Sequence, residues 1–321
     1  MRKILAIDGG GIKGVFPAAF LSTVEESLGE GVASYFDLIV GTSTGGIIAI
    51  GLGLGLSAAD ILRLYEAMGP HVFAQPGPFM RRLRSAQFSQ QPLREALHER
   101  LGNRVLGESR SRLVIPSFNA ERGEVHLYKT AHHPRFERDY KEKAVEVALA
   151  TAAAPTYFPI HVSPDGIPLI DGGVFANNPV GLAVVEAIGV LGWSKDDLVA
   201  LSLGCTTPPF DPRARIRWLK VRGDGFAYWG AKGLDVFMAA QSSASIGTAQ
   251  VLIGHDQVLR ISPTVPSGRF SLASTKDTPA LKGLGSVLAR EHLPKMRELF
   301  FNEKSESFHP CRSVTGERPY V

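Results

Sequence analysis

The stretch LIVGTSTGGIIAI, residues 38–50, places one serine, Ser43, between glycines where one apolar run ends and another begins. The run that ends at residue 40 is rich in β-branched residues and predicts a buried strand, and the residues after the glycines predict a helix. The pattern G-x-S-x-G in this setting is typical of a serine held in a strained turn with its hydroxyl exposed. Ser43 is therefore a candidate nucleophile; the alternative is a glycine turn that only tolerates a serine.

A second glycine cluster, DGGGIKG, occupies residues 8–14. It follows an apolar run at 3–7 that predicts a strand and precedes helical apolar spacing at 15–28. The glycines satisfy G-x-G-x-x-G, but the second strand does not end in the acidic residue that would bind ribose in a dinucleotide site. Glycine-rich backbone at a helix start also favours other anions, including an oxyanion, and Lys13 would add positive charge beside it. A tight turn without chemistry is the alternative.

A third glycine motif, IDGG, puts Asp171 directly after the strand-like run PLI. A carboxylate there can accept the serine proton directly if one oxygen lies about 3 Å from Oγ. Asp8 has the same local pattern, and for both aspartates the alternative is a side chain that binds turn amides. Of the nine histidines, His255 is the best placed, yet each is better explained as a surface or core histidine.

The rest of the chain alternates apolar strands with helices. We expect two strands joined by a turn within residues 112–129 and a strand at 198–204, with helices at 141–154 and 178–192. A further helix begins at Ser57, because S-A-A-D forms a capping box. This alternation predicts an α/β fold with a mostly parallel sheet covered by helices on both faces. We assign one domain to residues 1–301 and a polar C-terminal tail to residues 302–321.

The composition is that of an ordinary globular protein. Of the 321 residues, 44% are hydrophobic and 21% are charged, and the formal net charge is +4. Cys205 and Cys311 are too few and too far apart for a disulfide scaffold or a zinc cluster. The apolar run at the N-terminus is too short for a signal peptide or a spanning helix, so we expect a cytoplasmic protein with peripheral membrane contact.

Two segments stand apart from this pattern. Residues 69–92 hold four prolines and little periodicity, and we interpret them as an irregular excursion or a lid, the alternative being a packed surface loop. Its aromatic and basic side chains could meet lipid and headgroups; they are Phe73, Phe79, Phe88, Arg81, Arg82 and Arg84. Basic residues also gather at 213–222, with Trp218, Tyr228 and Trp229 nearby. They could bind phosphates and stack on bases, or be a solvated surface.

Taken in this order, DGGGIKG, GTSTG and DGG resemble the patatin-like phospholipases, a family of lipid acyl hydrolases with a Ser-Asp dyad. YFDLIVGTSTGGIIA and ATAAAPTYFP are also similar to the family, and the matching pieces spread over residues 4–180. The resemblance implies a three-layer α/β/α fold, with Ser43 as the nucleophile and Asp171 as its base. The third motif ends in Gly173, where the family allows either glycine or alanine.

The same resemblance assigns the oxyanion hole to the backbone amides of Gly9, Gly10 and Gly11. It implies that catalysis needs no metal, no cofactor and no histidine. IDGGGIKGVFPAAFL and LIVGTSTGGIIAIGLGLGLSA are similar to the bacterial subgroup that acts in cyclic-oligonucleotide anti-phage signalling. In that subgroup a cyclic dinucleotide, such as cGAMP, activates degradation of membrane phospholipids. The expected partners are thus a phospholipid membrane, at the inner membrane, and a cyclic dinucleotide, but no DNA or RNA; a homo-oligomer is left open.

Two other functions remain open at this point. A soluble esterase with a Ser-His-acid triad would depend on one histidine. A non-enzymatic nucleotide-binding module would use DGGGIKG to hold phosphate and would not need the hydroxyl of Ser43.

Overall fold

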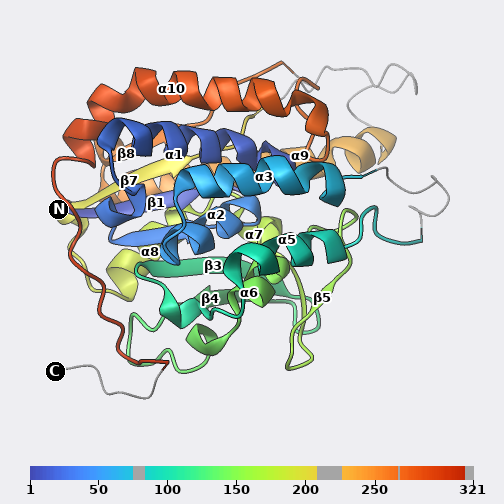
Figure 1. The fold of residues 1–321 in the computed structure, drawn as a ribbon, viewed down its shortest axis with the longest axis horizontal. Coiled ribbons are helices and arrows are strands. Elements are labelled where there is room, and N and C mark those ends of the chain that lie inside the picture. Colours follow the sequence, from blue (N-terminus) through green and yellow to red (C-terminus); the bar gives the residue numbers. More distant parts are fainter. Residues whose placement is uncertain (75–83, 208–225, 267, 315–321) are drawn as a thin grey trace.

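A computed structural model describes residues 1–74, 84–207, 226–266 and 268–314, with 226–235 as backbone only (Figure 1). Its sheet has eight strands in the order β5-β6-β3-β2-β1-β7-β8, and β4 pairs with the other edge of β3. The strands are β1 (Arg2–Ile7), β2 (Leu38–Gly41), β3 (Arg112–Asn119), β4 (Glu124–Lys129), β5 (His161–Val162), β6 (Pro168–Asp171), β7 (Leu198–Leu203) and β8 (Val258–Ile261). The pairings among β3, β2, β1, β7 and β8 are all parallel, as predicted, whereas β4, β5 and β6 run antiparallel to their neighbours.

Helices cover both faces of the sheet and form the outer two of three layers. The larger core packs under α1 (Val15–Leu28), α2 (Thr44–Gly53), α3 (Ala58–Val72), α5 (Gln91–Leu101), α6 (Ala144–Thr151) and α10 (Thr278–Leu299). The second core packs under α8 (Val180–Gly189) and α9 (Phe226–Ile253), while α7 (Gly173–Ala176) is one turn after β6. In Figure 1, α1 and α10 run side by side along the upper layer, and these two helices are in contact. The predicted α/β fold class is confirmed.

The strand β1 explains why its sequence is apolar without alternation. Leu5 and Ile7 face the larger core, while Ile4 and Ala6 face the second one. Because successive side chains of a strand point to opposite faces, a strand covered on both sides needs apolar residues at every position. The C-terminal end of β1 therefore lies in the interior of the fold, and the glycine cluster begins there.

The predicted helix start at Ser57 is confirmed, but the Asp60 carboxylate accepts from the Ser57 hydroxyl at 2.6 Å, whereas a capping box would have it accept from the Ser57 amide. The Ser57 hydroxyl accepts a hydrogen bond from the Asp60 amide at 3.1 Å and caps α3. The expected excursion at 69–92 is shorter than predicted, because α3 continues through Pro70 to Val72 and α5 begins at Gln91. Proline in a helix removes one backbone donor, which weakens a helix without always ending it.

The described part of the predicted polar tail, residues 302–314, lies against the body of the fold. The Ser305 amide donates to the Ser34 carbonyl at 2.9 Å, and the Cys311 amide donates to the Ala131 carbonyl at 2.7 Å. These backbone bonds fix the tail, which runs down the left side of the view in Figure 1, past the N-terminus. The tail therefore makes tertiary contacts although its composition is polar.

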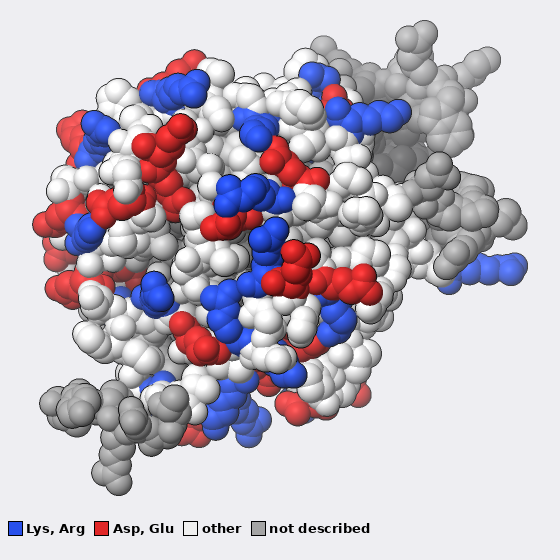
Figure 2. All heavy atoms as spheres, in the orientation of Figure 1, with Lys and Arg blue, Asp and Glu red and all other residues white. Residues whose placement is uncertain are grey.

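The helix α9 combines an apolar composition with exposure. By length and composition alone, Val236–Ile253 could cross a membrane, and little of it is buried in the fold. Phe237 and Val251 are exposed on it. The same helix is joined to the segment after β6, since Gln241 Nε2 donates to the Val174 carbonyl at 2.6 Å. On the face shown in Figure 2, basic and acidic side chains are intermixed.

The close packing of α2 against β1 gives a first prediction. A Cβ at Gly45 would lie 2.2 Å from the Ile7 carbonyl oxygen, which is backbone and cannot rotate away. We expect Gly45→Ala to lower the free energy of unfolding by about 2 kcal/mol or more, measured by urea denaturation. The matched control is Gly247→Ala in α9, where a Cβ would meet nothing within 4 Å; it should stabilise the helix by up to about 1 kcal/mol. Equal unfolding midpoints for Gly45→Ala and wild type would contradict this view of the packing.

Candidate active site

Ser43 lies between β2 and α2, in the strand-turn-helix setting that the sequence predicts. Its backbone has φ 56° and ψ −122°, a conformation that residues with a Cβ rarely adopt. The flanking glycines are required sterically, because a Cβ at Gly41 would lie 2.1 Å from the Gly45 carbonyl oxygen. Such strain persists where the surrounding packing imposes it, and it is common at functional sites.

Two threonines tie this turn to its surroundings. The Ser43 amide donates to Thr151 Oγ1 at 3.0 Å, and the Thr151 hydroxyl in turn donates to the Pro116 carbonyl at 2.6 Å. The Thr42 hydroxyl donates to the Ala176 carbonyl at 2.7 Å, in the segment after β6. Sequence reasoning did not single out Thr151, although it lies in the stretch ATAAAPTYFP that was noted for its family likeness. The sequence around a buried threonine at a helix end does not indicate which groups its hydroxyl will hydrogen-bond to.

Asp171 is the last residue of β6, where it pairs with Ser117 of β3. Burial raises the pKa of Asp171 to about 6, while the neighbouring Ser43 hydroxyl and the Gly173 amide oppose that rise. The Gly173 amide lies 2.7 Å from Asp171 Oδ1. The fold thus brings together the serine and the aspartate that the sequence singled out. A carboxylate in this environment can accept a proton from the serine hydroxyl.

The glycine cluster after β1 lies beside them, and its three amides are not equivalent. The Gly9 amide donates to the Asn177 carbonyl at 3.0 Å, so it is not free to bind an oxyanion. Within the described residues, the amides of Gly10 and Gly11 donate no hydrogen bond. Gly11 has φ 56°, and a Cβ there would lie 2.3 Å from the Leu272 carbonyl oxygen. The expected set of three glycine amides is therefore reduced to two with free donors.

Beneath this glycine cluster lie groups that the sequence did not connect with it. The Asp8 carboxylate pairs with the Arg260 guanidinium, and no amide among the described residues donates to it. Burial raises the pKa of the Cys205 thiol to about 12, which keeps it protonated and a poor nucleophile. The Lys13 ammonium lies beside the cluster, as expected, and donates to the Thr206 carbonyl at 3.0 Å.

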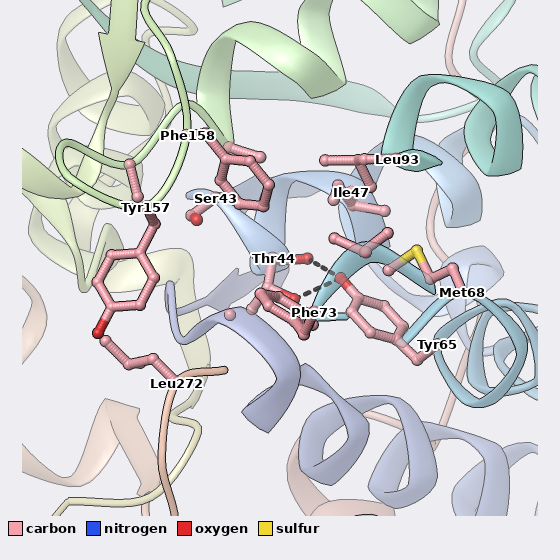
Figure 3. Close-up of a pocket in the computed structure, with 14 residues that line it drawn as sticks. Ser43, Thr44, Ile47, Tyr65, Met68, Phe73, Leu93, Tyr157, Phe158 and Leu272 are labelled. Atoms are coloured by element: carbon pink, nitrogen blue, oxygen red, sulfur yellow. Dashed lines mark hydrogen bonds between the residues drawn. The ribbon is translucent and has the colours of Figure 1, made fainter. Parts of the chain in front are cut away.

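An apolar pocket opens next to Ser43 (Figure 3). It encloses about 520 Å³ including its open mouth, and its lining is almost entirely hydrophobic. In Figure 3, Phe158 lies near Ser43, whereas Met68 and Leu93 lie on the far side of the pocket. The Tyr65 hydroxyl faces the wall and donates to the Thr44 carbonyl at 2.9 Å. A pocket of this kind accepts an apolar chain, with polar groups only at the serine end.

Two buried histidines face carboxylates of other elements. His132 Nε2 lies 3.0 Å from Glu186 Oε1, and His161 Nε2 lies 3.4 Å from Glu146 Oε2. His255 belongs to an exposed single turn before β8. In the part of the chain that the structure describes, no histidine hydrogen-bonds to Ser43, and no group of three or more His, Cys, Asp or Glu side chains could hold a metal ion.

Two of the three aromatic residues expected on a lid, Phe73 and Phe88, pack inward. The rings of Phe73 and Phe88 are 5.4 Å apart, and Phe88 lies 6.2 Å from Phe158. The idea that Phe88 meets lipid is wrong, because it is only 8% exposed; Phe73 lines the pocket. Arg84 is exposed, as expected. The other expected lid side chains, Phe79, Arg81 and Arg82, lie outside the described residues, as do the basic cluster at 213–222 and the side chains of Tyr228 and Trp229.

Comparison with known proteins supports the family resemblance independently. Residues 5–184 match the family model described as patatin-like phospholipase. The chain is 36% identical over 245 residues to a cGAMP-activated phospholipase of Pseudomonas aeruginosa, covering 75% of this chain and 72% of that protein. It is also 36% identical over 202 residues to a Vibrio cholerae protein of the same name, but there the alignment covers 57% of each chain.

Among solved structures, VipD from Legionella pneumophila has a TM-score of 0.46 and 13% identity, covering 92% of this chain and 67% of VipD. The family assignment rests on the sequence matches. The family model covers more than half of the chain, and the Pseudomonas protein aligns with three quarters of it. This chain therefore belongs to the patatin-like phospholipase family.

Proposed function

We propose that this chain hydrolyses fatty acyl esters of membrane phospholipids with Ser43 as nucleophile and Asp171 as base. The observation that carries the proposal is the Ser43 hydroxyl next to the buried Asp171 carboxylate, with Ser43 also lining an apolar pocket. A serine hydroxyl alone is a weak nucleophile, and an adjacent base within hydrogen-bonding reach activates it.

In the first half of the reaction, Asp171 accepts the proton of Ser43 as Oγ attacks the ester carbonyl. The carbonyl oxygen becomes an oxyanion, and we assign the amides of Gly10 and Gly11 as its donors, because neither donates a hydrogen bond within the described residues. When the tetrahedral intermediate collapses, the C–O bond to the alcohol breaks and Asp171 returns its proton to the leaving alkoxide. The products of this half are an acyl-serine and a lysophospholipid.

The second half repeats these steps with water. Asp171 takes a proton from the attacking water, the oxyanion forms again on the same amides, and collapse breaks the bond to Ser43 Oγ. The serine regains a proton from Asp171, and the fatty acid is released. The reaction needs Asp171 ionised at the start of each half.

The pocket supports a fatty acyl chain as the group transferred. Its lining is almost entirely hydrophobic, and each buried methylene of a ligand contributes about 0.8 kcal/mol. The long chain would then lie with its carbonyl at Ser43 and its methyl end toward Met68 and Leu93.

We further propose that a cyclic dinucleotide such as cGAMP activates this enzyme in anti-phage defence. Support comes from the Pseudomonas and Vibrio relatives, both of which are described as cGAMP-activated phospholipases. An enzyme that attacks the membrane of its own cell needs such a switch. The proposed site of action is the inner membrane, reached from the cytoplasm.

Fatty-acid release from vesicles of phosphatidylethanolamine and phosphatidylglycerol tests both parts. We expect release by wild type to rise on addition of one member of a panel of cyclic dinucleotides, and Ser43→Ala to release nothing with any of them. Undiminished release by Ser43→Ala would contradict the assigned nucleophile. Release that depends on Ser43 but does not change with any nucleotide would contradict activation by a cyclic dinucleotide. Nucleotide binding with no release by folded wild type would favour the non-enzymatic module.

The raised pKa of Asp171 predicts the pH dependence. Because Asp171 must be ionised to act as base, kcat/KM for a short soluble ester should fall as pH drops through about 6. Asp171→Asn should abolish turnover at every pH. It should not lower Tm at pH 8, because a buried carboxyl with a raised pKa destabilises the fold above its ordinary pKa of 3.8, and Asn removes that charge.

The matched control is His255→Gln, which should keep full activity. Loss of turnover in a folded histidine variant, with Asp171→Asn still active, would instead establish a histidine-dependent triad.

The pocket predicts chain-length selectivity. Met68→Trp or Leu93→Trp should shorten the pocket at its far end, so that kcat/KM for a laurate ester falls at least tenfold, about 1.4 kcal/mol, while that for a butyrate ester is kept. Val185→Trp, at an exposed position of α8, is the matched control. Equal losses on both esters would show that the acyl chain lies elsewhere.

A further inference from the structure

A buried ion pair holds Asp8, the first residue of the glycine cluster, and the reaction described above does not use it. Arg260 Nη1 donates to Asp8 Oδ1 at 2.8 Å, and Arg260 Nη2 donates to Asp8 Oδ2 at 2.5 Å. The side chain of Asp8 is 6% exposed and that of Arg260 is 18% exposed. Such a fork of two parallel bonds fixes orientation as well as distance. A charged pair in this position calls for an explanation, because charges are expensive to bury.

The sheet register explains how Arg260 reaches Asp8. Arg260 pairs with Ser202 of β7, and Ser202 pairs with Ala6 of β1. Side chains of paired residues in parallel strands point to the same face, and Asp8 lies two residues beyond Ala6. The guanidinium therefore passes over Ser202, to which Nη1 also donates at 2.8 Å, and meets the carboxylate at the end of β1. The Arg260 side chain of the edge strand β8 thus extends across β7 to the start of the glycine cluster.

Asp8 is held by its backbone too. Its amide donates to the Leu203 carbonyl at 2.9 Å, and the Cys205 thiol lies 3.7 Å from its carbonyl oxygen. Downstream, the Ile12 amide donates to the Leu272 carbonyl at 2.9 Å. The two free amides lie between these fixed points, on glycines that have no side chain of their own to hold them. The direction in which the two amides point depends on how firmly the loop is held at Asp8 and at Ile12.

We propose that Arg260 is a positioning residue for the oxyanion hole: it holds Asp8, and through Asp8 it aims the amides of Gly10 and Gly11. This inference rests on the proposed function. Preorganised donors cost no rearrangement when the oxyanion forms, and removing one donor lowers kcat by about 10²–10³. Arg260 also neutralises the carboxylate, so that Asp8 does not oppose the negative charge that develops next to it.

Arginine and lysine differ in the property that matters here. Lysine would keep the positive charge but offers a single ammonium on a flexible stem instead of a planar fork. Arg260→Lys therefore preserves charge and loses alignment. The double variant Asp8→Asn/Arg260→Gln removes both charges and leaves no unpaired ion in the interior. Together these variants separate alignment of the loop from stability of the fold.

The experiment measures kcat and KM for a short soluble ester, with cGAMP present throughout, and amide hydrogen exchange of the peptide that covers residues 8–14. We expect Arg260→Lys to lower kcat at least tenfold with KM changed less than threefold, and to speed exchange in that peptide but not in α10. The double variant should have a higher Tm than Arg260→Gln but no recovery of kcat. The matched control is Arg63→Lys, because Arg63 pairs with Asp60 at 2.6 Å on the surface of α3; it should change neither quantity.

Wild-type kcat in both Arg260→Lys and the double variant would overturn the proposal and leave the pair a stability feature. Recovery of kcat together with Tm in the double variant would overturn it as well, since loss of alignment would then be harmless. Faster exchange without a fall in kcat would show that the loop does not need this support. Hydrogen exchange reports on the loop even if wild type hydrolyses no ester, so failure of the proposed function is distinguishable from failure of this inference.

Discussion

The close approach of two glycine turns, at the ends of β1 and β2, is the constraint on which the site depends. Gly45 lies against the carbonyl of Ile7, and a Cβ at Gly14 would lie 2.2 Å from Thr44 Oγ1. Neighbouring parallel strands end at the same edge of a sheet, so the two turns meet there. Only residues without side chains let the first turn of α2 come that close to β1. The strained backbone of Ser43 is the consequence.

The segment after β6 joins the parts of the site to one another. It directly follows Asp171, accepts hydrogen bonds from Thr42 and Gly9 through its carbonyls, and accepts one more from Gln241 of α9. A displacement of this one segment would shift the base and the glycine cluster together. A switch that acts on it would therefore change proton transfer and oxyanion binding at the same time.

Several features of the site oppose stability. The fold buries a carboxylate whose pKa is raised to about 6, keeps a serine at positive φ, and leaves the amides of Gly10 and Gly11 without partners among the described residues. Each of these is expensive in isolation. Two cores on the two faces of the sheet, with β1 apolar at nearly every position, offset the cost. Sites of this kind are commonly less stable than the framework that holds them.

The sequence alone was sufficient for the strands and helices around the three glycine motifs and for the α/β class, because apolar periodicity and glycine turns are local signals. It also singled out Ser43 and Asp171, since both follow apolar strands directly. It could not distinguish Gly9 from Gly10 and Gly11, because the Asn177 carbonyl that occupies the Gly9 amide is distant in the chain. For the same reason it did not reveal Thr151, Arg260 or the inward packing of Phe88. Those contacts are set by strand order and register, and register is a property of the assembled sheet.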